Sequence, residues 1–204
     1  LRALEQSGDV VVPHRKHQLR GILLDRLGQH EEAFAAFAAM NAERQDEPAR
    51  PLELARLYRE QIVHDQTLIT PEWLSSWTPP IPSGPRRAPV FLVGFPRSGT
   101  TLLDTMLMAA PDTLILEEEP FIGNAEVMLG GVEGLATASA EQLTAAREQY
   151  FEQVGSVGAL GPETVVIDKH PLHLNKVPTI RRLFPDAQFI LALRHPCDVL
   201  LSCF

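Results

Sequence analysis

Lysine is scarce in this chain of 204 residues, where Lys16, Lys169 and Lys176 stand against 15 arginines. Basic side chains are also outnumbered by acidic ones, 18 to 26, which gives a formal net charge of −8. A protein of this charge is not expected to bind nucleic acid in general, and an anionic ligand needs a local cluster of positive charge. The composition therefore directs attention to individual basic residues.

Cysteine is rare too, and long apolar runs are absent. Cys197 and Cys203 are six residues apart, which fits neither a CxxC pair nor half of a zinc site, so we expect two buried thiols in a reducing compartment. No apolar run approaches the roughly 20 residues of a membrane-spanning helix, and no signal peptide is visible. We expect a cytoplasmic protein without a membrane partner. Because the chain starts with Leu1 and its last predicted helix lacks a stop signal, we also expect an internal piece of a longer protein.

The N-terminal part, residues 1–77, is predicted to be helical. Residues 17–44 carry two apolar stripes separated by Gly28-Gln29, the pattern of two helices joined by a short turn. The stretch "LGQHEEAFAAF" resembles the last unit of a tetratricopeptide array, although any helical hairpin remains an alternative. Such a unit cannot bury its own apolar face, so further repeats are expected. The helical part could recruit a protein partner or simply brace the rest of the protein.

A proline-rich linker is predicted at residues 78–89, "TPPIPSGPRRAP", because proline prevents helix continuation. After it, strand and helix signals alternate over residues 90–204. Apolar strands alternating with helices predict an α/β domain, with a parallel sheet flanked by helices. In such sheets, ligands bind beyond the carboxyl ends of the strands. The predicted strands are 90–93, 114–116, 165–168 and 189–193, and the predicted helices are 100–109, 141–154, 177–183 and 196 onward.

The segment "GFPRSGTT", residues 94–101, resembles a phosphate-binding loop that has lost its lysine. The nucleotide triphosphatase loop reads G-x-x-x-x-G-K-[ST], and here Thr100 occupies the lysine position while Arg97 lies inside the loop. Backbone N–H groups of the glycine turn and the helix dipole would attract an anion, and the arginine fork can bind two oxygens. Hydroxyl donors come from Ser98, Thr100 and Thr101. The loop, with Gly99, is thus suited to a terminal phosphate or sulfate rather than to the end of a triphosphate.

A second candidate anion site is the segment "FILALRHPCDVLLS". Arg194 directly follows a predicted strand, and a helix is expected to begin at Pro196, a favoured first position. Ser202 lies eight residues beyond Arg194, about two helical turns, so both can face one phosphate.

Together these two segments are similar to the sulfotransferase family. The match covers residues 90–204, and the tyrosylprotein and tetratricopeptide-linked bacterial branches are most alike, because cytosolic aryl sulfotransferases usually place lysine before Ser-Gly-Thr. The resemblance implies that the first segment binds the 5′-phosphosulfate of 3′-phosphoadenosine-5′-phosphosulfate and the second its 3′-phosphate. It also implies transfer of the sulfuryl group to an acceptor hydroxyl or amine without a metal ion.

A third region, "ILEEEPFIG" and "VIDKHPLHLNK", supplies candidates for proton removal and for charge stabilisation. The family resemblance implies that Glu118 is the base, with Glu117 and Glu119 as rivals because the register is uncertain by one residue. It likewise implies that Lys169, with Arg97, stabilises the transition state. His170 and His173 are alternative bases, because neutral imidazole accepts protons at pH 7.

Two other functions remain open from the sequence. One is a small-molecule kinase or nucleotide triphosphatase with a degenerate loop, for which Asp168 would be the Mg²⁺ ligand. The other is a helical-repeat scaffold whose α/β part has lost catalysis. The acceptor could be a peptide, a carbohydrate or a small molecule, and the sequence does not choose among them.

Overall fold

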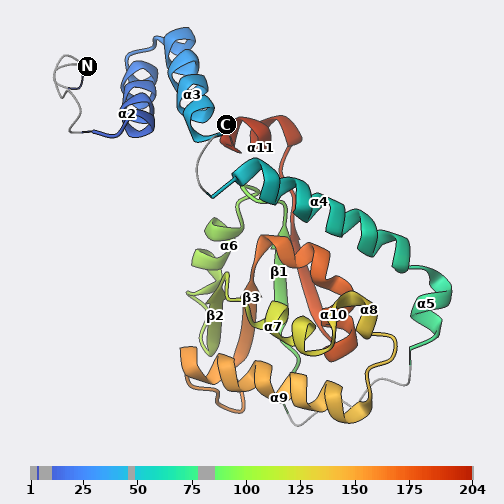
Figure 1. Cartoon of the computed structure of the whole chain (residues 1–204). Helices are drawn as coiled ribbons and strands as arrows, with labels where there is room; N and C mark the ends of the chain where they lie inside the picture. Colours follow the sequence, from blue (N-terminus) through green and yellow to red (C-terminus); the bar gives the residue numbers. More distant parts are fainter. Residues whose placement is uncertain (1–3, 5–10, 46–48, 78–85, 204) are drawn as a thin grey trace. The chain divides into compact units, whose positions relative to one another are not determined.

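The computed structural model describes residue 4 and residues 11–45, 49–77 and 86–203 (Figure 1). The chain divides into two compact units, one ending at Gln61 and the other covering Ile62–Cys203, so the division falls inside helix α4 (Pro51–Leu68). Most of the proline-rich linker, residues 78–85, lies outside the described residues. The domain boundary predicted there therefore stays a prediction.

The N-terminal unit is built around a helical hairpin of α2 (Pro13–Arg26) and α3 (His30–Arg44). Gly28 makes the turn between them with φ of 74°, a left-handed conformation that favours glycine. Leu24 packs against α3 in a small core. A Cβ on Gly21 would lie 2.7 Å from the ring of Phe37, so the close helix approach depends on this glycine. The hairpin is as predicted, while its likeness to a tetratricopeptide repeat stays a prediction.

The second unit contains a four-stranded parallel sheet in the order β2-β3-β1-β4. The strands are β1 (Val90–Gly94), β2 (Thr113–Glu117), β3 (Val165–Lys169) and β4 (Gln188–Ala192). The helices are α5 (Pro71–Ser75), α6 (Thr100–Leu107), α7 (Phe121–Met128), α8 (Gly131–Gly134), α9 (Ala140–Val157), the 3₁₀ helix η2 (Pro171–Lys176), α10 (Val177–Leu183) and α11 (Pro196–Cys203). The predicted α/β architecture is confirmed.

The two faces of the sheet carry different cores. Phe91 and Leu116 point into the larger core, which α7, α9 and α10 cover. Leu92 and Ile167 point to the other face, where α6 contributes Leu103. Side chains along each strand point alternately to the two faces of the sheet. Neighbouring residues of β3 therefore lie on opposite faces.

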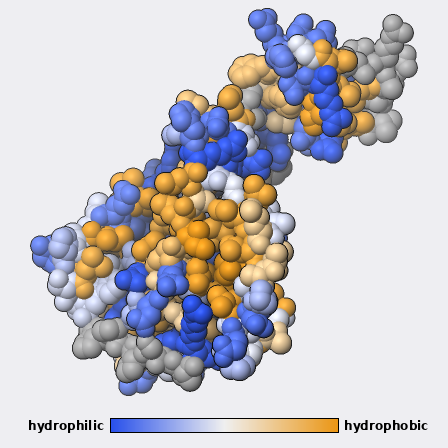
Figure 2. All heavy atoms as spheres, turned by 180° about the vertical axis from the view of Figure 1, so that it is seen from behind, coloured by the Kyte–Doolittle hydropathy of each residue, from blue (hydrophilic) through white to orange (hydrophobic). Residues whose placement is uncertain are grey.

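Apolar residues also gather on the surface of the α/β unit seen from the side opposite to Figure 1 (Figure 2). Strand β4 ends one side of the described sheet, and its residues Ile190 and Leu191 are exposed. Leu193, immediately after the strand, is 82% exposed.

The prediction of buried thiols is wrong. Cys197 and Cys203 are both exposed free cysteines of α11. Among the described residues of this helix, Val199 alone is buried, so most of the helix surface, including both thiols, faces outward. In the described parts of the chain, no helix is long and apolar enough to cross a lipid bilayer.

Candidate active site

A pocket of about 300 Å³ opens at the carboxyl ends of the strands. Parallel register explains its place, since Gly94 pairs with Ala192 and Glu117 pairs with Lys169, which brings the four strand ends to one edge. The pocket is lined by Pro96, Arg97, Gly99, Thr100, Thr101, Glu118, Pro171, Arg194 and Ser202. Seven of the nine predicted site residues, all except Ser98 and Lys169, thus line one pocket, and they come from three regions far apart in the sequence.

The segment 94–101 forms a tight turn between β1 and α6. Gly99 caps the N-terminus of α6 with φ of 90°, and a Cβ there would be strained whatever the space. Arg97 adopts φ of 68°, which is uncommon for a residue with a side chain. At Gly94 a Cβ would lie 2.7 Å from the backbone oxygen of Ala192, so the close approach of β1 and β4 requires glycine. Ser98 is half-buried in the turn and does not line the pocket.

Two arginines from opposite ends of the α/β sequence meet at the pocket. Arg97 Nε donates to Ser202 Oγ at 2.9 Å, and an Arg194 guanidinium nitrogen donates to the backbone oxygen of Arg97 at 3.0 Å. Both arginines are exposed, so their remaining N–H groups can meet a ligand. This pair supplies the local positive charge that a protein of net charge −8 needs to bind an anion.

Of the three consecutive glutamates, Glu118 is the one that lines the pocket. Its φ of 55° turns the chain immediately after β2, and its backbone N–H donates to the backbone oxygen of Lys169 at 2.8 Å. Glu117 is the last residue of β2 and is paired with Lys169 in register, whereas Glu119 is half-buried. The sequence left open which of the three glutamates faces the pocket. In the structure, Glu118 alone of the three lines it.

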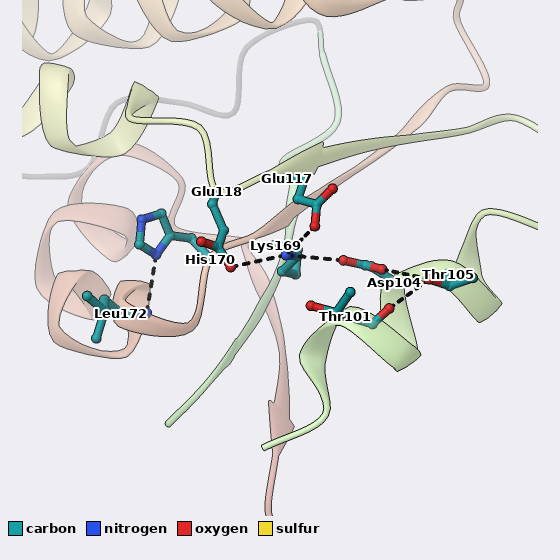
Figure 3. A network of polar contacts seen from close by, with 8 residues as sticks. All are labelled: Thr101, Asp104, Thr105, Glu117, Glu118, Lys169, His170 and Leu172. Carbon is teal, nitrogen blue, oxygen red and sulfur yellow. Dashed lines mark hydrogen bonds and ion pairs between the residues drawn. The ribbon is translucent and has the colours of Figure 1, made fainter. Parts of the chain in front are cut away.

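Lys169 lies behind the pocket rather than on its wall. Its side chain has no exposed surface, and its Nζ is 3.1 Å from Glu117 Oε1, 3.2 Å from Glu118 Oε1 and 3.3 Å from Asp104 Oδ2 (Figure 3). Burial by itself would lower the pKa of Lys169, but its close contacts with the carboxylates of Glu117, Glu118 and Asp104 raise it above its ordinary value. The ammonium is thus held in its charged form next to the pocket carboxylate.

Asp168, one residue earlier, points to the opposite face of the sheet. It is fully buried and accepts a hydrogen bond from Tyr150 Oη at 2.9 Å. Burial raises the pKa of Asp168 to about 7, and Tyr150 moderates that rise by bonding to the carboxylate. Asp168 does not line the pocket, whereas a kinase would need this residue there to bind Mg²⁺. Its position therefore argues against the kinase hypothesis. Among the described residues, no group of three or more His, Cys, Asp or Glu side chains could hold a metal ion.

The two histidines proposed as alternative bases are not part of the pocket wall. His173 is buried, with Nδ1 3.4 Å from Asp168 Oδ1, and burial lowers its pKa to about 3. His170 stacks on it with ring centroids 4.4 Å apart, and its Nδ1 accepts from the backbone N–H of Leu172 at 3.2 Å, which caps η2. Burial also lowers the pKa of His170. Both rings have structural partners.

Sequence reasoning missed Asp104 and the buried pair of Tyr150 and Asp168. A signal for Asp104 did exist, since it is the one charged residue in the predicted apolar helix "TTLLDTML". No comparable signal announces Tyr150, because a tyrosine on an amphipathic helix is ordinary core material.

Known proteins resemble this chain over the same α/β part. The family model described as "Sulfotransferase family" matches residues 89–204. The "Nodulation protein NoeE" of Sinorhizobium fredii is 29% identical over 126 residues, which cover 55% of this chain and 30% of that protein. "Protein-tyrosine sulfotransferase 1" of Danio rerio is 32% identical over 114 residues, or 52% and 32% of the two chains. An "Uncharacterized protein" of Aquifex aeolicus is 26% identical over 130 residues, or 58% and 17%.

The chain therefore spans about a third or less of the length of these relatives. The family match nonetheless covers more than half of the chain and includes every residue that lines the pocket. The chain belongs to the sulfotransferase family.

Proposed function

We propose that the protein transfers a sulfuryl group from 3′-phosphoadenosine-5′-phosphosulfate to an acceptor hydroxyl or amine. The observation that carries this proposal is the meeting of Arg97, Arg194 and Glu118 around one pocket. Two anion-binding groups suit a donor with two separate phosphates, and a carboxylate beside them suits the removal of a proton from the acceptor.

In the proposed reaction the acceptor oxygen or nitrogen attacks sulfur, and Glu118 takes the acceptor's proton. The bond from sulfur to the bridging oxygen of the 5′-phosphate breaks, so negative charge develops on that phosphate. Arg97 and the N-terminus of α6 stabilise this charge, because preorganised donors are worth most where charge develops. Lys169 acts from behind Glu118, at 3.2 Å, and no step requires a metal ion.

The 3′-phosphate is assigned to Arg194 and Ser202. These residues bond to the Arg97 region, which supports one shared site for the bisphosphate. Gly99, Thr100 and Thr101 add loop and helix N-terminal groups on the 5′ side, with Ser98 in the turn immediately before them.

The acceptor is proposed only as a class. One relative is named as a protein-tyrosine sulfotransferase and another as a nodulation protein, and these names point to different acceptors. A role of the N-terminal helices in recruiting a protein partner, and a cytoplasmic location, belong to the proposal as well.

Binding of the desulfated product tests the proposal without knowledge of the acceptor. Calorimetry with 3′,5′-phosphoadenosine in EDTA is compared with ATP in Mg²⁺. We expect metal-independent binding of the bisphosphate that falls at least tenfold in Arg97→Ala and in Arg194→Ala, because each loses a charge-assisted contact. Arg87→Ala is the matched control, since this exposed arginine lies before β1, at the opposite edge of the sheet. Binding of ATP–Mg²⁺ without binding of the bisphosphate would favour a kinase. Binding of neither ligand would favour a scaffold.

A transfer assay then tests the base. The donor is incubated with water alone, p-nitrophenol or a tyrosine-containing peptide, and release of the bisphosphate is measured. Glu118→Gln should lose a hundredfold or more of the turnover, within the roughly 10²–10⁴ range of general base catalysis, while its bisphosphate affinity stays unchanged. Glu117→Gln is the control and should lose much less. Equal losses in the two variants would remove the assignment to Glu118.

A further inference from the structure

The three carboxylates around Lys169 are not equivalent. The Asp104 side chain is 2% exposed, whereas those of Glu117 and Glu118 are 60% and 55% exposed. Asp104 Oδ2 has no hydrogen bond among the described residues and lies 3.3 Å from Lys169 Nζ. A buried carboxylate is costly without a nearby cation, so the pair of Asp104 and Lys169 is the fixed part of the cluster and the two glutamates form its solvent side.

Asp104 belongs to the same helix that begins at the phosphate-binding loop. It lies one turn after Thr100, and Thr105 Oγ1, which donates to the backbone oxygen of Thr101 at 2.8 Å, is 3.3 Å from Asp104 Oδ1. Figure 3 shows Asp104 reaching from α6 towards Lys169, with Glu118 on the far side of the ammonium. One continuous series of contacts thus runs from the N-terminus of α6 to the pocket carboxylate.

The position of Lys169 Nζ decides where Glu118 Oε1 rests, since the two atoms are 3.2 Å apart. Without a charge at residue 104, the lysine would have only the solvent-side carboxylates to bind, and its flexible stem could move towards them. A shift of about 1 Å at a catalytic group can cost about a hundredfold in rate. The buried aspartate therefore has a consequence for the pocket although it does not line it.

We propose that Asp104 is a positioning residue for sulfuryl transfer, which acts through Lys169 to hold the Glu118 carboxylate at the edge of the donor pocket. This inference rests on the proposed function and adds to it a residue of α6 that touches neither donor nor acceptor. The position of the proton acceptor Glu118 would then depend on α6, the helix that binds the donor.

The experiment combines Asp104→Asn with Lys169→Met in a double-mutant cycle in the intact protein. The donor is supplied with p-nitrophenol or the tyrosine-containing peptide, and kcat is expressed per bisphosphate-binding site measured by calorimetry. We expect Asp104→Asn to lower kcat by about ten- to a hundredfold and to change bisphosphate affinity by less than threefold. In the Lys169→Met background the same substitution should change kcat less than threefold, because residues that act through one another are not additive.

The control and the contrary outcomes are specific. Asp112→Asn is the matched control. This exposed aspartate immediately precedes β2, so it lies at the amino ends of the strands, opposite to the pocket, and asparagine tolerates its φ of 59°. Additive losses in the cycle, or a normal kcat in Asp104→Asn, would overturn the positioning role. If Asp104→Asn cannot be purified, Asp104→Glu keeps the charge but displaces it by one methylene; we expect it to fold with a kcat lowered at least fivefold, and a wild-type kcat would overturn the proposal. A wild-type protein that neither binds the bisphosphate nor releases it from the donor would instead refute the proposed function.

Discussion

At the scale of single residues, backbone strain coincides with the pocket. Four non-glycine residues in the described parts of the chain have positive φ, and two of them, Arg97 and Glu118, line the pocket. Such conformations cost of order 1–3 kcal/mol and persist where the surrounding structure holds them. Here the holding contacts are the bond from Arg194 to the Arg97 backbone and the bond from the Glu118 N–H to Lys169. The strain aims two side chains that the proposed chemistry needs.

Asp168 leads to a prediction about stability and pH. Its pKa is raised from 3.8 to about 7 by burial, so between these pH values the folded protein holds a proton that the unfolded chain releases. The free energy of unfolding therefore falls as pH rises from about 4 to 7, and the cost stays in place above 7. Asp168→Asn removes this cost while an amide oxygen can still accept from Tyr150. We expect the melting temperature of the variant, relative to wild type, to rise by several degrees from pH 5 to pH 8.

Thermal unfolding followed by circular dichroism at pH 5, 6, 7 and 8 measures this difference. His173 does not mask it, because the pKa of His173 is about 3 in the folded protein and its titration in the unfolded chain is common to both proteins. A difference that is constant with pH would show that Asp168 is ionised in the folded protein at pH 5. Asp112→Asn, at an exposed position, should show no trend.

The positions of individual residues could be predicted best from the sequence where one short segment contains both a strand and the residue that follows it. Arg97 and Arg194 each follow a strand, and parallel strands end at one edge, so their meeting could be expected from 97 residues apart. The contacts of Lys169 could not be predicted, because the sequence does not reveal that Asp104 packs against it from α6. The glutamate register depended on one positive φ, which no propensity for glutamate would suggest.

At the scale of elements, the end of β1 determines the geometry of the proposed anion site. Gly94 pairs with Ala192, and Arg194 follows only two residues later. The predicted strands and helices of this region have nearly the observed bounds, because apolar runs bounded by glycine and proline give a strong local signal. By contrast, α7, α8 and η2 were not predicted, because short helices interrupted by glycine or proline carry little periodicity.

Substitution at this strand end gives an element-scale prediction. Gly94→Ala would place a Cβ 2.7 Å from the backbone oxygen of Ala192, and backbone cannot rotate away as a side chain can. We expect β4 to be pushed from β1, with a loss of about 1–3 kcal/mol in the free energy of unfolding and at least tenfold weaker binding of 3′,5′-phosphoadenosine. Urea unfolding and calorimetry measure the two effects.

Gly155→Ala in α9 is its matched control, because nothing lies within 4 Å of a Cβ at that position. Alanine should stabilise the helix there by about 0.5–1 kcal/mol without changing ligand affinity. If Gly94→Ala bound the bisphosphate as well as wild type, the strand contact would not be what positions Arg194.

At the scale of the whole molecule, the pocket lies within one of two units. Every residue that lines the pocket, and both large cores of the sheet, fall within Ile62–Cys203. Ile69 and Trp73, which follow the division of the chain, pack against the larger core and therefore belong with the sheet. The α2–α3 hairpin has a small core of its own.

This division predicts that the helical hairpin is dispensable for donor binding. A shortened protein that begins at Pro51, the first residue of α4, keeps all the core residues of the α/β unit. We expect it to bind 3′,5′-phosphoadenosine with an affinity within threefold of the intact protein, because no ligand-facing charge is removed. Calorimetry on the two proteins measures this. A large loss of affinity in a folded shortened protein would show that residues before α4 support the pocket, whereas unchanged binding with reduced transfer to a peptide acceptor would assign the hairpin to acceptor recruitment.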